Sequence, residues 1–125
     1  MGALNNYFNK IYCINLKRRP DRWKRVSKMF ENYSVDVQRI EAIDGSIHGH
    51  LSLLRPSQYG CFMSHKSAYE DAVKNGYEKI LILEDDVYFD KNINSYDFEK
   101  LPEWDMMYPG ASQAPNTNVW DVEMK

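Results

Sequence analysis

The stretch KILILEDDV, residues 79–87, joins a run of four aliphatic side chains to three consecutive carboxylates. A short continuous apolar run of this kind is typical of a strand that is buried on both faces of a parallel sheet. The run ends abruptly at Glu84, Asp85 and Asp86, which repel one another when no cation is present. The segment therefore predicts a buried strand that carries an acidic cluster at its carboxyl end.

The chain before this strand alternates predicted strands and helices. Residues 11–16 and 35–41 are rich in β-forming side chains, and residues 20–33 have helical spacing after Pro20. A second helix is expected to begin near Ser57 and to end at Gly76. This order predicts an α/β protein with a Rossmann-like, mostly parallel sheet, right-handed crossovers and helices on both faces.

Within these helices, apolar side chains at helical spacing are expected to face the core. In the first helix they are Trp23, Val26, Phe30 and Tyr33, and in the second they are Phe62, Tyr69, Ala72 and Val73. The weaker signals predict a short helix at 96–101, a strand at 105–108 and a further strand at 119–124. We expect one domain over residues 1–110, with a polar tail of the same domain at 111–125.

Charge is distributed unevenly along the chain. The formal net charge is −2, but residues 1–66 are basic on balance and residues 67–125 are acidic. A chain without a strong basic excess is a poor candidate for nucleic-acid binding, whereas a basic end facing an acidic end suits a phosphate ligand carried with a divalent metal. The longest strongly apolar run is far shorter than the roughly 20 residues of a membrane helix, so we expect no membrane span and a cytoplasmic location.

Polar clusters follow the first three predicted strands, at the edge where parallel sheets bind ligands. Glu84 and Asp86 point the same way if the strand continues, and their hard oxygen atoms suit Mg²⁺ or Mn²⁺. Asp85 then points elsewhere, to a structural partner. The alternative interpretation is an exposed acidic turn that pairs with nearby lysines.

The basic run at residues 17–25 spans the turn into the first helix, where backbone N–H groups favour anions. Two interpretations remain for Arg18, Arg19 and Arg22: they bind a diphosphate, or they lie on the surface. Three further basic side chains are expected to be solvated on the helix surface: Lys24, Arg25 and Lys28.

The remaining candidates for chemistry are weaker. Ser64 lacks the surroundings of a hydrolase nucleophile, and a lone helical histidine such as His65 is more often a hydrogen-bonded residue than a catalyst. The pair His48 and His50 has no matching third ligand nearby in the loop. Cys13 and Cys61, the two cysteines of the chain, have no disulfide or metal-binding spacing and are expected to lie in the core as thiols.

Taken together, these segments resemble glycosyltransferase family 25, which includes bacterial lipooligosaccharide and procollagen galactosyltransferases. The resemblance rests on five blocks in family order: Asn15-Leu16 with Asp21-Arg22, Ala42-x-Asp44-Gly45, GCFMSH at 60–65, LEDDV at 83–87 and WDMMYPG at 104–110. Pro109 stands where a leucine is more usual in the family.

The resemblance implies a GT-A fold, a UDP-galactose or UDP-glucose donor and Mn²⁺ or Mg²⁺, with the acidic cluster in place of a DxD motif. It also implies a glycan or hydroxylated protein as acceptor and a role such as lipopolysaccharide biosynthesis. Asp86 and Glu84 are the expected metal ligands. The expected donor-binding residues are Asn15, Arg18, Arg22, Asp44, Glu84 and Asp85.

The resemblance leaves the catalytic base unassigned, and His65 is a candidate only by elimination. Family members continue well beyond this length, so the chain is expected to be either a donor-binding half or an enzyme that completes its site as a homo-oligomer. The alternative to a hexosyltransferase is a catalytically inactive nucleotide-sugar- or partner-binding module. A Mg²⁺-dependent phosphatase fits poorly, because its nucleophile would be an aspartate where Glu84 stands.

Overall fold

The structure is a computed structural model that describes residues 2–44 and 56–107, and it contains a three-stranded parallel sheet. β1 (Lys10–Asn15) lies in the middle, with β2 (Gln38–Glu41) on one side and β3 (Ile80–Glu84) on the other. The first three predicted strands and their parallel pairing are therefore confirmed.

The register of the sheet aligns the carboxyl ends of its strands. Asn15, the last residue of β1, lies beside Glu41 of β2, and its neighbour Ile14 lies beside Glu84 of β3. All three strands therefore end at the same edge of the sheet. Because ligands of open α/β sheets bind at this edge, the register decides which side chains can meet there.

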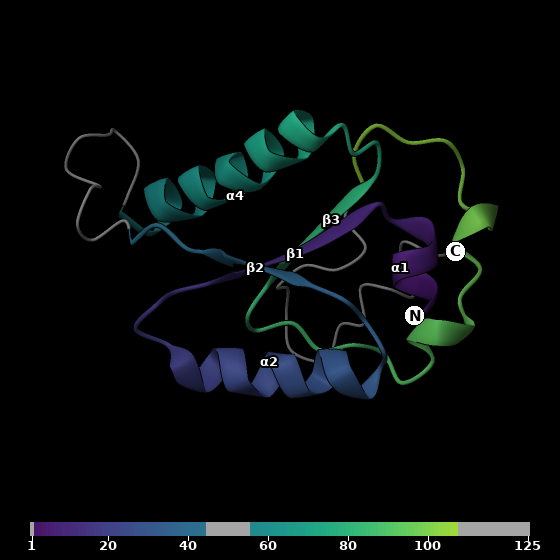
Figure 1. Cartoon of the computed structure of the whole chain (residues 1–125), viewed down its shortest axis with the longest axis horizontal. Coiled ribbons are helices and arrows are strands. Elements are labelled where there is room, and N and C mark those ends of the chain that lie inside the picture. Colours follow the sequence, from purple (N-terminus) through teal and green to yellow (C-terminus); the bar gives the residue numbers. More distant parts are fainter. Residues whose placement is uncertain (1, 45–55, 108–125) are drawn as a thin grey trace.

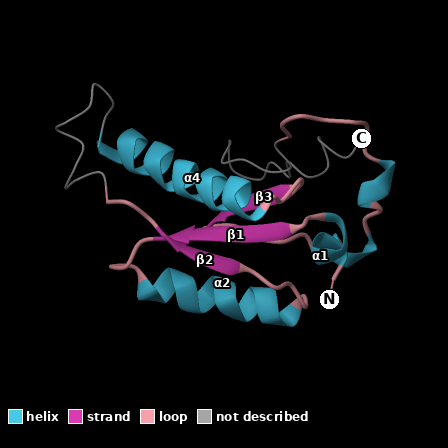
Figure 2. Ribbon diagram, turned by 45° about the horizontal axis from the view of Figure 1, so that its top comes forward, coloured by secondary structure: helices cyan, strands magenta, loops and turns pink. Residues whose placement is uncertain are grey.

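Two helices cover the two faces of this sheet (Figures 1 and 2). α2 (Pro20–Asn32) packs on one face and α4 (Pro56–Asn75) on the other. A short helix, α1 (Ala3–Tyr7), and two 3₁₀ turns at Ile93–Ser95 and Phe98–Lys100 lie at the opposite end of the strands from the polar clusters (Figure 1). The arrangement is the predicted Rossmann-like α/β sheet with helices on both faces.

α2 forms where the sequence predicts it. Pro20 occupies the first turn, where its missing N–H costs nothing, and Asp21 lies at the positive end of the helix dipole. Val26 and Phe30 are buried against one face of the sheet. The side chains of that face include Ile11, Cys13, Leu81 and Leu83. Two further side chains of the predicted face, Trp23 and Tyr33, are partly buried at the margin of the same cluster.

α4 corrects the prediction of which helix face is buried. Its sheet-facing stripe consists of small residues four apart: Gly60, Ser64, Ala68 and Ala72. Of the predicted inward residues only Ala72 is buried, while Phe62, Tyr69 and Val73 are exposed, Val73 by 81%. The sheet contributes the large side chain of Tyr12 to this interface. The helix can therefore pack closely against the sheet only where its own side chains are small.

Other sequence predictions are corrected or lie outside the described residues. Cys13 is buried, but Cys61 is exposed and does not belong to the core. The predicted helix at 96–101 is a single 3₁₀ turn, and residues 105–107 form no strand. Residue 108, the strand predicted at 119–124 and the tail at 111–125 lie outside the described residues. Within the described ranges, no helix has the length and apolar character to cross a membrane.

The orientation of both helices is testable with two matched substitutions. Phe30→Ala should lower the free energy of unfolding by about 3–5 kcal/mol, because it removes a buried ring that contacts Phe89 and Trp23. Phe62→Ala, the control on α4, should change it by less than about 0.5 kcal/mol, since that ring is 59% exposed. Urea unfolding measures both, and equal losses would contradict the orientation of α4.

Candidate ligand site at the strand ends

Asn15 connects the three strand ends through its side-chain amide. Its Nδ2 donates to Asp85 Oδ2 at 2.7 Å and to the Arg19 carbonyl at 3.0 Å, and its Oδ1 accepts from Arg39 Nε at 3.1 Å. Nδ2 therefore makes two hydrogen bonds and Oδ1 makes one. Asn15 is only 2% exposed. Asn15 acts as a rigid structural junction behind the site.

The acidic segment Glu84-Asp85-Asp86 divides into one buried and two exposed residues. Asp85 is 8% exposed and is held by Asn15 and by Arg22 Nη1 at 3.4 Å. Glu84 and Asp86 are exposed. The predicted division, in which Asp85 turns to a structural partner, is confirmed, whereas a donor-binding role of Asp85 stays a prediction.

Arg25 fixes the backbone of this acidic segment. Its Nη2 donates to the carbonyl oxygens of Asp85 at 3.1 Å and Val87 at 2.8 Å, and its guanidinium lies 4.1 Å from the centre of the Tyr88 ring. The prediction that Arg25 is a solvated surface residue is therefore wrong. Its neighbour Lys24 is exposed, as the sequence predicted.

The arginines before and within α2 pair with carboxylates around the strand ends. Arg18 Nε lies 3.2 Å from Asp44 Oδ2, and both side chains keep contact with solvent. Arg19 binds Asp21, and this guanidinium lowers the pKa of the Asp21 carboxyl to about 2. Of the three candidate diphosphate ligands, Arg18 and Arg22 therefore lie at the site, while Arg19 is turned to its own helix.

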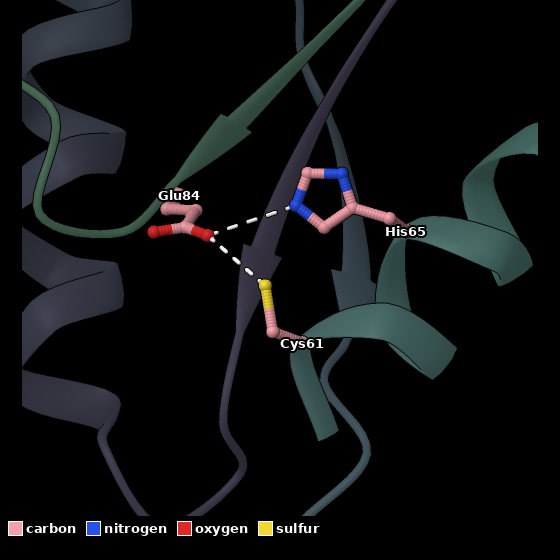
Figure 3. Close-up of side chains that lie close together, drawn as sticks. All are labelled: Cys61, His65 and Glu84. Carbon is pink, nitrogen blue, oxygen red and sulfur yellow. Dashed lines mark hydrogen bonds and ion pairs between the residues drawn. The ribbon is translucent and has the colours of Figure 1, made fainter. Parts of the chain in front are cut away.

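Glu84 is in contact with two residues of α4 (Figure 3). His65 Nε2 lies 3.6 Å and Cys61 Sγ 3.7 Å from the same oxygen, Glu84 Oε1. His65 is the largest cause that lowers the pKa of the Glu84 carboxyl, against an opposing effect of burial. Burial, followed by the charge of Glu84, raises the pKa of the Cys61 thiol.

Ser64 has a structural role beside this cluster. Its Oγ donates to the Gly60 carbonyl at 2.6 Å and accepts from the Ile43 N–H at 2.9 Å, so it ties the segment after β2 to α4. Ser64 is 1% exposed, which agrees with the expectation that it is not a hydrolase nucleophile. The histidines at positions 48 and 50 lie outside the described residues.

These side chains surround a cleft of about 400 Å³ at the carboxyl ends of the strands. Such a volume lies in the range of small-molecule sites. The cleft brings together His65 and all the expected metal- and donor-binding residues except Asn15, which lies behind it. Its lining also includes apolar residues and Cys61, to which the sequence analysis gave no role at the site. The lining residues are Ile14, Leu16, Arg18, Arg22, Ala42, Ile43, Asp44, Gly60, Cys61, Ser64, His65, Glu84, Asp85 and Asp86.

The fold and the cleft define an α/β protein of the Rossmann-like class with a cleft lined by charged side chains at its strand ends. Residues 8–112 match the sequence profile described as glycosyltransferase family 25 (LPS biosynthesis protein). This match covers most of the chain, which therefore belongs to glycosyltransferase family 25.

The similar curated proteins include a family member named as a galactosyltransferase and members named as inactive. Procollagen galactosyltransferase 2 of Homo sapiens is 29% identical over 85% of this chain and 21% of its own length. Inactive glycosyltransferase 25 family member 3 of Mus musculus is 30% identical over 85% of this chain and 22% of its own length. A glycosyltransferase 25 family member of Aedes aegypti is 30% identical over 82% of this chain. The chain spans about a fifth of the length of these relatives, and no solved structure matches it.

The anchoring role of Arg25 is testable against its exposed neighbour. Arg25→Leu should lower the free energy of unfolding by about 1–3 kcal/mol, because two part-buried carbonyl oxygens lose their donor. Lys24→Leu is the matched control and should change it by less than about 0.5 kcal/mol. If urea unfolding gives equal values for both variants, Arg25 does not hold the acidic segment.

The contact between His65 and Glu84 predicts a change in the acid titration of Glu84. His65→Ala removes the main cause of the lowered pKa and leaves burial, which raises it, so the pKa of Glu84 should increase. A carbon-13 NMR titration of the Glu84 carboxyl in metal-free protein measures this shift. Lys66→Ala, on the next residue of α4, is the control, and an unchanged Glu84 pKa in His65→Ala would refute the contact.

Proposed function

We propose that this cleft binds the diphosphate and sugar of a UDP-hexose, and that the chain is the donor-binding part of a family 25 hexosyltransferase. The sugar is galactose or glucose, and the acceptor is a glycan or a hydroxylated protein. The observation that carries the proposal is the convergence of arginine and carboxylate side chains in one cleft at the ends of three parallel strands. The naming of a relative as a procollagen galactosyltransferase supports the reaction class.

The basic side chains of the cleft suit the diphosphate. The Arg18 side chain is 67% and the Arg22 side chain 42% exposed, so both guanidinium groups are accessible while each remains beside a carboxylate. A guanidinium can bind phosphate oxygens in a bidentate manner. In this proposal Asp44, which pairs with Arg18 and is part-buried, faces the nucleoside side of the donor.

Asp86 fits a hard divalent cation such as Mn²⁺ or Mg²⁺. It lines the cleft and is exposed, and no hydrogen bond or ion pair engages its carboxylate within the described residues. Such cations are commonly held by one or two carboxylates together with substrate phosphates. We propose Asp86 as the main protein ligand and Glu84 as the second. When bound, the cation would stabilise negative charge on the departing diphosphate.

The other residues of the cleft give this proposal its geometry. Asn15 and Arg25 hold the acidic segment from behind, so that Asp86 is presented on a fixed backbone. Among the described residues, His65 is the one that brings an imidazole to the cleft lining, and it is the group to test for a base role toward an acceptor hydroxyl.

A second candidate function is a catalytically inactive module that binds a nucleotide sugar or a protein partner. The observation that favours it is the presence, among similar proteins, of family members named inactive. A transferase and an inactive nucleotide-sugar-binding module both require the donor cleft, so donor binding does not separate these two. Acceptor-dependent release of UDP does, because only the transferase produces it.

Donor binding is tested by calorimetry with UDP-galactose and UDP-glucose, each with and without Mn²⁺. We expect Asp86→Ala to weaken the Mn²⁺-dependent binding by at least about tenfold, since it removes a metal ligand. Asp105→Ala, which removes an exposed carboxylate outside the cleft, is the control and should bind as the wild type does.

Three outcomes of this calorimetry test the donor site and its metal ligand. Binding that requires both Mn²⁺ and Asp86 supports the donor site as proposed. Binding that is unaffected by either would contradict the metal assignment. An absence of binding by a folded protein would contradict the donor site itself.

A further inference from the structure

The cluster of Cys61, His65 and Glu84 offers three different metal-ligating groups from two elements. Cys61 and His65 lie one helical turn apart on α4, and Glu84 is the last residue of β3. One ligand atom from each residue lies within 4.8 Å of the other two. Figure 3 shows both α4 side chains directed at the Glu84 carboxylate.

The distances in this cluster match those between ligands of a tetrahedral metal ion. Zinc lies about 2.3 Å from cysteine sulfur and about 2.0–2.2 Å from histidine nitrogen or carboxylate oxygen. A regular tetrahedron with such bonds has ligand–ligand separations of about 3.3–3.7 Å. Two of the three observed separations match this geometry: 3.6 Å from nitrogen to oxygen and 3.7 Å from sulfur to oxygen. The third, from sulfur to nitrogen, lies within 4.8 Å. A zinc ion therefore fits after small side-chain adjustments.

The chemistry of the three ligands selects a borderline-soft cation. Thiolate and imidazole favour Zn²⁺ over Mg²⁺ or Mn²⁺, which prefer oxygen ligands. The cluster therefore differs from the hard-cation position proposed at Asp86, although Glu84 is a proposed ligand in both. Cys61 is exposed, and the side chains of His65 and Glu84 are 30% and 53% exposed, so an ion can enter from solvent.

We propose that Cys61, His65 and Glu84 form a Zn²⁺ site with three protein ligands at the edge of the cleft. The fourth position faces solvent and takes a water molecule, as in zinc sites that keep an open position. Binding replaces the thiol proton of Cys61, which passes to solvent, by a sulfur–zinc bond. The ion joins the N-terminal half of α4 to the end of β3, two walls of the cleft.

The site is tested on the full chain, reduced and freed of metal, with Zn²⁺ alone and with Co²⁺ as a spectroscopic substitute. Wild-type protein should bind Zn²⁺ with one-to-one stoichiometry in a chelator competition. It should give the intense visible absorption of tetrahedral Co²⁺ and a thiolate-to-cobalt charge-transfer band. Cys13 does not contribute this band, because it is buried and burial raises the pKa of its thiol to about 12.

Two variants and one control make the test specific. Cys61→Ser should abolish the charge-transfer band, and both Cys61→Ser and His65→Ala should weaken Zn²⁺ binding by more than about tenfold. Circular dichroism confirms that each variant is folded. The double variant His48→Ala/His50→Ala removes the other histidines of the chain and should keep the band.

The proposal is overturned if either Cys61→Ser or His65→Ala binds Zn²⁺ as the wild type does. It is also overturned if the histidine control loses the charge-transfer band, because the ligands would then differ from those proposed. No nucleotide sugar is present in these experiments. Zinc binding can therefore fail while donor binding succeeds, and the reverse, so the two proposals are judged separately.

Discussion

The buried hydrogen bond between Asn15 and Asp85 is the interaction on which the site depends. It joins the end of the central strand to the turn after β3 at 2.7 Å, and the Asn15 side chain also reaches Arg39 of β2 and the Arg19 carbonyl before α2. A buried carboxylate is costly unless it is paired and hydrogen-bonded. Asp85 meets this requirement through Asn15 and Arg22, so its position is fixed by the sheet.

This constraint determines what the neighbouring carboxylates can do. With Asp85 turned inward and its carbonyl held by Arg25, Glu84 and Asp86 remain exposed on either side of it. Glu84 meets α4, and Asp86 faces the cleft without an ion pair in the described part of the chain. One anchored residue thus gives its two neighbours different surroundings. This is why we propose Asp86 as the main ligand of an oxygen-ligated cation, and Glu84 as the second ligand of that cation and as a ligand of the zinc ion.

The sequence predicts the strands, the first helix and the converging strand ends because these depend on local patterns. The apolar run at residues 79–83 by itself indicates a buried strand, and Pro20 by itself indicates the start of a helix. The buried face of α4 could not be predicted in the same way. Its large residues, such as Phe62, suggest a core position, but the bulk of Tyr12 on the opposing sheet selects the small ones.

Tertiary contacts also explain what was missed at the site. Arg25 has the sequence environment of a surface residue, yet it reaches carbonyl oxygens 60 and 62 positions away. The apolar stretch around Cys61 suggests a core thiol. Only the packing of α4 beside β3 shows that Cys61 contacts Glu84. The roles of Arg18, Arg22, Asp44 and Asp86 in donor binding follow from their placement in the cleft and stay predictions.

The most direct test of the donor cleft is an NMR titration of the isotopically labelled chain with trace Mn²⁺ and then UDP-galactose. Paramagnetic Mn²⁺ broadens the signals of nearby nuclei, so the amides of residues 85–87 should broaden first. UDP-galactose should then shift the amides of Arg18, Arg22 and Ile43, which line the cleft. Broadening confined to acidic residues outside the cleft, such as Glu103 and Asp105, with no shift at the strand ends, would contradict the proposed site.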